Sequence, residues 1–137
     1  MMNDRYYYKA KHMHVLKNSH LDGIWVAGFL ADERYIVDAF TGYECLIDPK
    51  TICQCTGLQD KNGRLIYEHD ILSGHLDPNF PDDETREVVR WEGYKFVTRQ
   101  LPIKDHMPEE LDEWDGEHFE VIGNEFDNKE LMEERSV

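Results

Sequence analysis

The chain has 137 residues, of which 40% are hydrophobic and 12% aromatic, and its formal net charge at pH 7 is −14. The apolar content excludes a disordered chain, and the length is sufficient for a globular core without metal or disulfide staples. The negative charge disfavours non-specific binding to nucleic acid, and no run of about 18 apolar residues predicts a membrane span. The first residues, MMNDRYYYK, lack the apolar segment of a secretory signal, so we expect none.

The charge is unevenly distributed along the chain. Residues 1–17 carry four cations against one acid, whereas residues 105–135 carry thirteen acids against two cations. We interpret the acidic C-terminal part as a solvated face, which is the usual role of such charge runs.

The N-terminal part has the pattern of short strands separated by turns. Segments rich in β-branched and aromatic residues predict strands at residues 24–30, 34–39 and 43–47. Asp32 and Glu33 suit a tight turn between the first two strands, and Pro49 suits a turn after the third. We therefore predict an N-terminal β subdomain over residues 1–54.

The C-terminal part adds strands and two brief helices. The pattern predicts a hairpin from residues 88–91 and 95–98, preceded by an exposed acidic loop, and a further strand at 119–122 that ends at Gly123. Brief helices are predicted at residues 108–114 and 127–134. For the second helix we expect Asp127 as the N-cap and Glu130 as its capping-box partner. These elements predict a second subdomain over residues 55–137 with an acidic C-terminal helix.

Many short strands and few helices predict a mainly β fold, formally α+β with few short helices. The strands are too few for two full sheets. We therefore expect a small, SH3-like, partly open β-barrel in the C-terminal half, with an N-terminal β extension and a short C-terminal helix. The two subdomains are expected to form one compact unit.

The sequence contains three cysteines, Cys45, Cys53 and Cys55. Cys53 and Cys55 would lie about 7 Å apart on one face of a strand, which is too far for an unstrained disulfide. Their spacing also departs from that of common zinc sites. We expect buried, reduced thiols and a cytoplasmic protein.

Two groups of residues have the chemistry of metal ligands but not the spacing. His12 and His14 could share one face of an edge strand, with His20 and Asp22 nearby, yet no third ligand is evident. An acidic loop also contains several candidate oxygen and nitrogen ligands without the spacing of a calcium loop: His75, Asp77, Asp82, Asp83 and Glu84. We interpret both groups as surface residues and expect no metal.

No sequence signature of a common enzyme class is present. The chain lacks the GxxxxGK[ST], GxGxxG, GxSxG and HExxH patterns that carry nucleotide, hydrolase and zinc-protease chemistry. We therefore expect a non-enzymatic protein without catalytic residues or a cofactor.

The stretch CTGLQDKNGRLIYEHDIL, residues 55–72, combines turn residues with strand residues. Gly57 and Gly63 stand where a positive φ is readily adopted, and Asp60 can accept hydrogen bonds from the amides of a turn that contains Asn62. The apolar residues that follow suit a strand entering a small SH3-like barrel. We interpret the stretch as scaffold rather than as a ligand site.

Residues 55–72 closely resemble the hallmark segment of the YopX family of bacteriophage and prophage proteins, which reads roughly [YC]TGLKDKNGKxI[YF]EGDIV. WVAGFL, DPKTICQ and the closing EVIGN segment resemble further family motifs, so the resemblance extends from about Tyr8 to Leu131. His69 and Lys129 depart from the family pattern, which usually has glycine and proline at these places. If the family's glycine has a positive φ, His69 would be left-handed at a cost of about 1–2 kcal/mol.

The resemblance implies a mostly β phage protein with an SH3-like C-terminal part, located in the cytoplasm of a bacterial host. It implies no established activity and provides no catalytic or ligand residues. Our first interpretation is an accessory protein that binds an unidentified host or phage protein, or that self-associates through exposed strand edges. An acidic mimic of DNA would be a special case of this interpretation.

The alternative interpretation is a nucleic-acid-binding module. Small barrels often bind nucleic acid with a sheet face that carries aromatic and cationic residues. The predicted hairpin could provide such a face with Trp91, Tyr94, Lys95 and Arg99. The acidic charge of the whole chain argues against this alternative.

Overall fold

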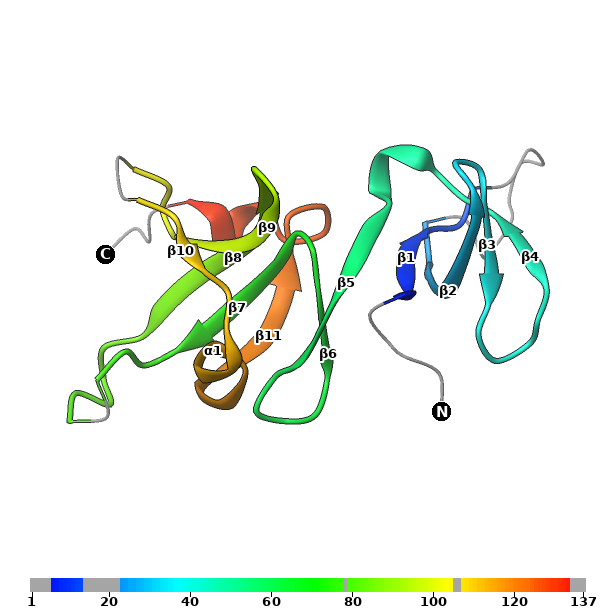
Figure 1. Cartoon of the computed structure of the whole chain (residues 1–137). Helices are drawn as coiled ribbons and strands as arrows, with labels where there is room; N and C mark the ends of the chain where they lie inside the picture. Colours follow the sequence, from blue (N-terminus) through cyan, green and yellow to red (C-terminus); the bar gives the residue numbers. More distant parts are fainter. Residues whose placement is uncertain (1–5, 14–22, 78, 105–106, 134–137) are drawn as a thin grey trace. The chain divides into compact units, whose positions relative to one another are not determined.

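The computed structural model describes residues 6–13, 23–77, 79–104 and 107–133. The chain divides into two units, unit 1 (Met1–Gly57) and unit 2 (Leu58–Val137). The chain forms two sheets (Figure 1), one of which extends from unit 1 into unit 2, and each unit has its own apolar core.

Unit 1 is built on antiparallel strands in the order β4-β3-β2-β1-β5. Their bounds are β1 Tyr8–Lys11, β2 Trp25–Asp32, β3 Tyr35–Asp38, β4 Glu44–Leu46 and β5 Cys53–Gln59, and a 3₁₀ turn, η2, spans Pro49–Thr51. Buried side chains of Ala10, Val26, Ile36 and Ile47 form its core. β5 continues beyond Gly57 into unit 2, where β6 (Leu65–Tyr67) follows it in the same sheet.

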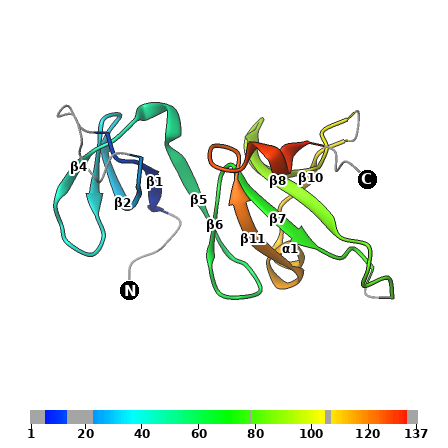
Figure 2. The same cartoon turned by 180° about the vertical axis from the view of Figure 1, so that it is seen from behind.

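Unit 2 contains a five-stranded antiparallel sheet with the order β10-β9-β8-β7-β11 (Figures 1 and 2). Its elements are β7 Asp70–Gly74, β8 Thr85–Glu92, β9 Lys95–Gln100, β10 Glu109–Glu110, α1 Glu113–His118, β11 Phe119–Asn124 and η3 Lys129–Met132. The core contains Ile66, Leu72, Val89, Phe119 and Val121. Alternation along β8 directs Val89 to this core and Val88 to the opposite face of the sheet.

The structure confirms the mainly β fold and the predicted strands. β2, β3, β4, β8, β9 and β11 coincide with the apolar segments within a few residues. Neither sheet closes on itself, since each has two terminal strands in its order. Within the described part of the chain, no helix is both long enough and apolar enough to cross a membrane.

The first brief helix begins later than predicted, and the second lies within its predicted range but is a 3₁₀ turn. Glu109 and Glu110 pair with β9 as strand β10, and α1 begins only at Glu113, because Asp112 and Asp115 form a capping box. At the C-terminus the helix is a 3₁₀ turn that begins at Lys129.

The expected N-cap at Asp127 is also wrong. The amides of Phe126 and Asp127 both donate to Oδ1 of Asn124, at 2.9 Å each, so Asp127 belongs to the preceding turn. Asn128 takes the N-cap position without a side-chain hydrogen bond to the helix.

The expected edge strand at the N-terminus is a central strand. β1 lies between β2 and β5 in the sheet. His12 follows it and forms an isolated bridge with Ile47. β1 is central because it pairs on both sides: Lys9 faces Ala27 in β2 and Cys53 in β5.

Candidate functional site

The β8–β9 hairpin contains the residues for which the sequence suggested an interaction face. Its register pairs Trp91 with Phe96 and Glu92 with Lys95 around a tight turn that contains Tyr94. Because paired residues share a face of a sheet, Trp91 lies on the opposite face from Lys95 and Arg99. The predicted residues therefore do not form one aromatic and cationic surface.

The aromatic residues of the hairpin are accessible. Tyr94 is 97% exposed at the turn, and Trp91 is 46% exposed. The Trp91 ring packs edge to face on Phe96, with 4.8 Å between the ring centroids, which holds it in place while leaving much of it open to solvent.

Every cation of the hairpin has an acidic partner within the chain. Arg99 forms a two-bonded pair with Glu92, at 2.5 Å for each N–O distance, and the hydrogen bond from Arg99 holds the Glu92 pKa below its usual value. The remaining pairs are Arg86–Glu84 at 2.7 Å, Arg90–Glu125 at 2.6 Å and Lys95–Glu110 at 4.0 Å. The hairpin therefore has no excess of positive charge to offer a phosphate backbone.

The turn of residues 55–72 is organised by one buried carboxylate. Asp60, which is 6% exposed, accepts hydrogen bonds from the amides of Asn62 and Arg64 through Oδ1 and from Val121 through Oδ2, each at 2.9 Å. Gly63 provides the positive φ of this turn, at 83°. Gly57 also has a positive φ, at 84°, in β5. These contacts support the scaffold interpretation.

His69 adopts the left-handed conformation expected from its place in the family pattern. Its φ is 73°, and among the described residues it alone has a positive φ without being glycine. Its Nδ1 lies 2.7 Å from Oε2 of Glu125, and this hydrogen bond raises the His69 pKa above its usual value. Burial disfavours the ionised Glu125, but hydrogen bonds from His69 and Arg90 outweigh it and lower the Glu125 pKa.

Gly123 ends the regular pairing of β11. A bulge separates Val121 from Gly123 in the pairing with β7. A Cβ on Gly123 would lie 2.4 Å from Oδ1 of Asn128, so this position requires a residue without a side chain unless Asn128 moves.

The metal-ligand candidates that the structure describes do not assemble into a site. His12 Nδ1 lies 2.8 Å from the Ile24 carbonyl, and His75 Nδ1 lies 3.0 Å from the Asp83 carbonyl. His14, His20 and Asp22 lie outside the described residues. In the remaining chain, no three His, Cys, Asp or Glu side chains are placed to hold a metal ion.

Cys53 and Cys55 are buried free thiols in β5, as predicted, and Cys45 is a partly exposed free thiol. Burial raises the Cys45 pKa, with a further contribution from the charge of Asp38. A raised pKa keeps the thiol protonated and unreactive.

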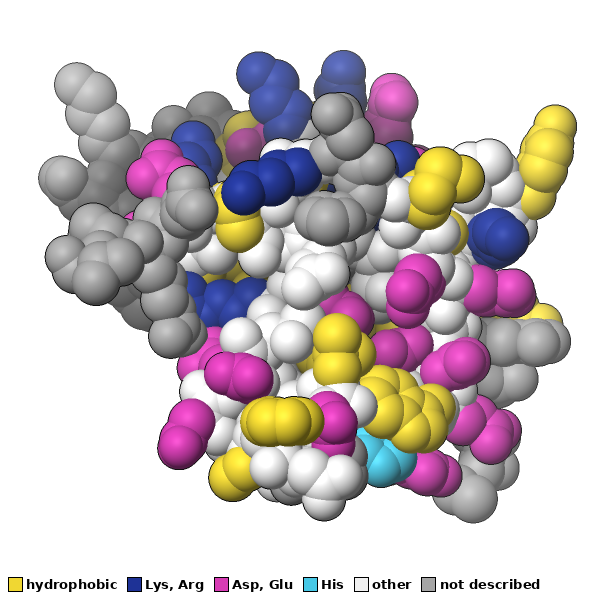
Figure 3. All heavy atoms as spheres, turned by 90° about the vertical axis from the view of Figure 1, so that its left-hand side faces the viewer, with side chains coloured by type: hydrophobic (Ala, Val, Ile, Leu, Met, Phe, Trp, Pro, Cys, Tyr) yellow, Lys and Arg dark blue, Asp and Glu magenta, His cyan; other side chains and the backbone are white. Residues whose placement is uncertain are grey.

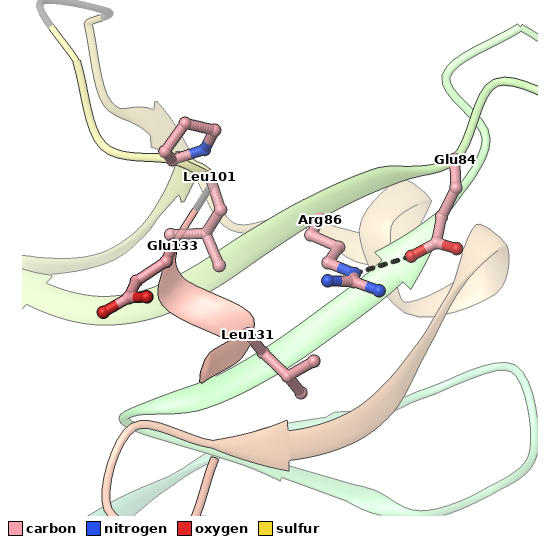
Figure 4. A pocket seen from close by; sticks show the side chains of 6 residues that line it. Glu84, Arg86, Leu101, Leu131 and Glu133 are labelled. Atoms are coloured by element: carbon pink, nitrogen blue, oxygen red, sulfur yellow. Dashed lines mark hydrogen bonds and ion pairs between the residues drawn. The ribbon is translucent and has the colours of Figure 1, made fainter. Parts of the chain in front are cut away.

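Unit 2 has several hollows, two of which are lined in part by β8. One is lined by Glu84, Arg86, Leu101, Pro102, Leu131 and Glu133, which come from the β7–β8 loop, β8, the segment after β9, and the C-terminal turn (Figure 4). Arg86 pairs with Glu84 in its wall, and Glu133 adds a further acid.

The second hollow is lined by Glu87 and its neighbours on β9 and β10. Glu87 is 5% exposed, and sequence reasoning missed it. The sequence could have indicated the burial of Glu87. Because Glu87 stands two residues before Val89 in a strand, its side chain shares the core-facing side of β8.

A family model described as YopX protein matches residues 3–133, nearly the whole chain. A search of curated proteins found no match. The match includes residues 55–72, whose turn geometry explains the glycines and Asp60 of the family's hallmark segment. The chain therefore belongs to the YopX family.

Proposed function

We propose that this chain is a non-enzymatic phage or prophage accessory protein that binds a protein partner through unit 2, in the cytoplasm of the bacterial host. The observation that carries the proposal is the β8–β9 hairpin, where exposed aromatic residues accompany cations that are already paired with acids. Tyrosine and tryptophan are the residues that contribute most to protein interfaces.

Charge favours a basic partner over a second copy of the chain. The face visible in Figure 3 has acidic side chains spread over it, with a group of hydrophobic side chains among them. Two such surfaces with a net charge of −14 per chain repel each other, whereas a basic protein is attracted. Self-association through the terminal strands of the sheets is the competing form of the same proposal.

Nucleic-acid binding is the second candidate, and the hairpin argues against it. Arg99 and Lys95, which would contact phosphates, face Glu92 and Glu110 instead. A phosphate would have to displace these carboxylates, and the acidic remainder of the chain would oppose it.

The proposal also places an SH3-like, partly open barrel in unit 2. Support comes from the five-stranded antiparallel sheet of unit 2, the core on one face of that sheet, and the short α1 helix before the last strand.

The test is a pull-down from host lysate with and without nuclease, using the native chain and two double variants. Trp91→Ser with Tyr94→Ser removes the exposed hairpin aromatics, and Phe40→Ser with Tyr43→Ser is the matched control on exposed aromatics of unit 1. We expect a nuclease-resistant partner that the first variant loses and the second retains.

A partner that disappears with nuclease would instead support nucleic-acid binding. Retention of the partner by the hairpin variant would overturn the proposed surface, and a dimer in light scattering without any partner would favour self-association.

A further inference from the structure

The pocket around Glu87 has the shape and lining of a small binding site. Its volume is about 230 Å³, and the residues that line it are Leu76, Glu87, Thr98, Gln100, Met107 and Glu109. At about 30 Å³ for each water of liquid, this space holds several non-hydrogen atoms. The pocket therefore accommodates a short alkyl chain with a polar head.

Glu87 is an incompletely satisfied carboxyl group in this pocket. The Thr98 side chain provides one hydrogen bond to it. Among the described residues, no group donates a hydrogen bond to Oε2, although this oxygen is buried. A buried carboxylate oxygen that lacks a donor is costly, and a positive charge held nearby would reduce that cost.

The charged groups that act on Glu87 are all acidic. Burial is the largest cause of the raised Glu87 pKa. The negative charges of Asp115, Glu109 and, more weakly, Asp112 raise it further, to about 7. Asp115 lies in α1, Asp112 caps that helix, and Glu109 lies in β10, which pairs with β9, so the carboxylates come from separate elements. Such a cluster creates a strong negative potential at the pocket.

We propose that this pocket binds an organic cation, namely an alkylammonium or alkylguanidinium group. Glu87 and Glu109 contact the charged head, while the side chains of Leu76 and Met107 contact the methylene groups. Thr98 and Gln100 provide further polar groups beside the head.

A metal ion fits the pocket less well than an organic cation. Within the described ranges, no three carboxylates are close enough together to hold one ion, whereas calcium requires six or more oxygen ligands. The apolar residues Leu76 and Met107 also offer no ligands to a metal, but they suit an alkyl chain.

Two sources can supply such a cation. One is a lysine or arginine side chain of a basic partner protein, and this source rests on the proposed function. The other is a free amine, which binds whether or not the chain has a protein partner.

The probes are n-butylammonium and n-butylguanidinium, with n-butanol as the uncharged control, titrated at constant ionic strength and followed by amide chemical shifts. We expect both cations to bind at pH 8 and to shift the Thr98 and Gln100 amides, and butanol to bind at least about tenfold more weakly, because one charged hydrogen bond provides 1.5–3 kcal/mol. Equal binding of butanol would overturn the proposal.

Glu87→Gln should weaken butylammonium binding about tenfold, whereas Glu110→Gln, which removes the same charge from β10 outside the pocket lining, should leave it unchanged. If Glu87→Gln does not fold, Glu109→Gln at the exposed rim replaces it, with an expected several-fold loss. Full binding by the folded pocket variant, or loss in the Glu110 control, would refute the site.

Lysine and arginine with both termini capped distinguish the two sources. Binding as tight as that of the free alkyl cations supports a partner side chain, and selective binding of the free alkyl cations supports a small amine. The Trp91→Ser, Tyr94→Ser variant should retain cation binding. Failure of the proposed hairpin surface to bind a protein can therefore be distinguished from failure of the pocket to bind a cation.

Discussion

Two buried carboxylates in unit 2, Asp60 and Glu87, have opposite surroundings. Both are about 95% buried, at 6% and 5% exposure. Asp60 receives backbone hydrogen bonds from Asn62, Arg64 and Val121, whereas Glu87 retains an oxygen without a donor in the described structure.

The number of hydrogen-bond donors around a buried acid decides its role. A carboxylate surrounded by backbone amides fixes the chain that carries them, and removing it exposes unsatisfied donors. A carboxylate with too few donors weakens the fold at neutral pH and favours a cation beside it.

The largest expected effect is the loss of Asp60. Asp60→Ala leaves the amides of Asn62, Arg64 and Val121 without their acceptor, so the free energy of unfolding should fall by about 3 kcal/mol. Urea denaturation measures the change. Asp48→Ala, which removes a partly exposed cap of η2, is the control and should cost only about 1 kcal/mol. Equal losses in the two variants would contradict the role of Asp60.

Glu87→Gln should raise the free energy of unfolding, the opposite of the change expected for Asp60→Ala. The Glu87 pKa is raised to about 7 in the folded state from 4.5, so its contribution to stability is present below pH 4.5 and is lost as the pH rises to about 7. The variant mimics the protonated form and should be more stable than the native chain by about 1–3 kcal/mol at pH 8. Denaturation at pH 8 and pH 5 checks this, since the gain should shrink at the lower pH. A loss of stability at pH 8 would mean that Oε2 of Glu87 also has a donor.

His69→Gly tests a residue in which strain and hydrogen bonding oppose each other. Relief of the positive φ should stabilise the chain by about 1 kcal/mol at pH 9, where His69 is neutral. The raised His69 pKa adds stability that is present below pH 6.5 and is lost as the pH rises through the folded-state value. The gain from glycine should therefore shrink or reverse at pH 5.5, as denaturation at both pH values would show. A pH-independent difference would argue against the Glu125 contact.

The smallest expected effect is on the exposed hairpin turn. Tyr94 is 97% exposed, so Tyr94→Ser should change the free energy of unfolding by less than about 0.5 kcal/mol. Thermal unfolding measures this, and a larger loss would show that Tyr94 belongs to the fold rather than to a surface available for a partner.

Part of the hairpin geometry could have been derived from the sequence. A two-residue turn at Gly93 and Tyr94 pairs Glu92 with Lys95 and therefore Trp91 with Phe96. Alternation then separates Trp91 from Lys95 and Arg99, which a count along the strands would have shown. The brief helices were not predictable from the local pattern, because Glu109 and Glu110 pair with a strand ten or more residues earlier.

Most strands, the turn of residues 55–72 and the family could be inferred from the sequence, because they follow from local alternation, turn chemistry and a nearly full-length match. Only the tertiary structure decided which acids are satisfied. The donor to Oδ2 of Asp60 is the amide of Val121, 61 residues away, and the charge that acts most on Glu87 comes from Asp115 in α1. Such partners meet only when the strands pack, and hydrogen bonds and desolvation depend on that packing rather than on neighbours in the chain.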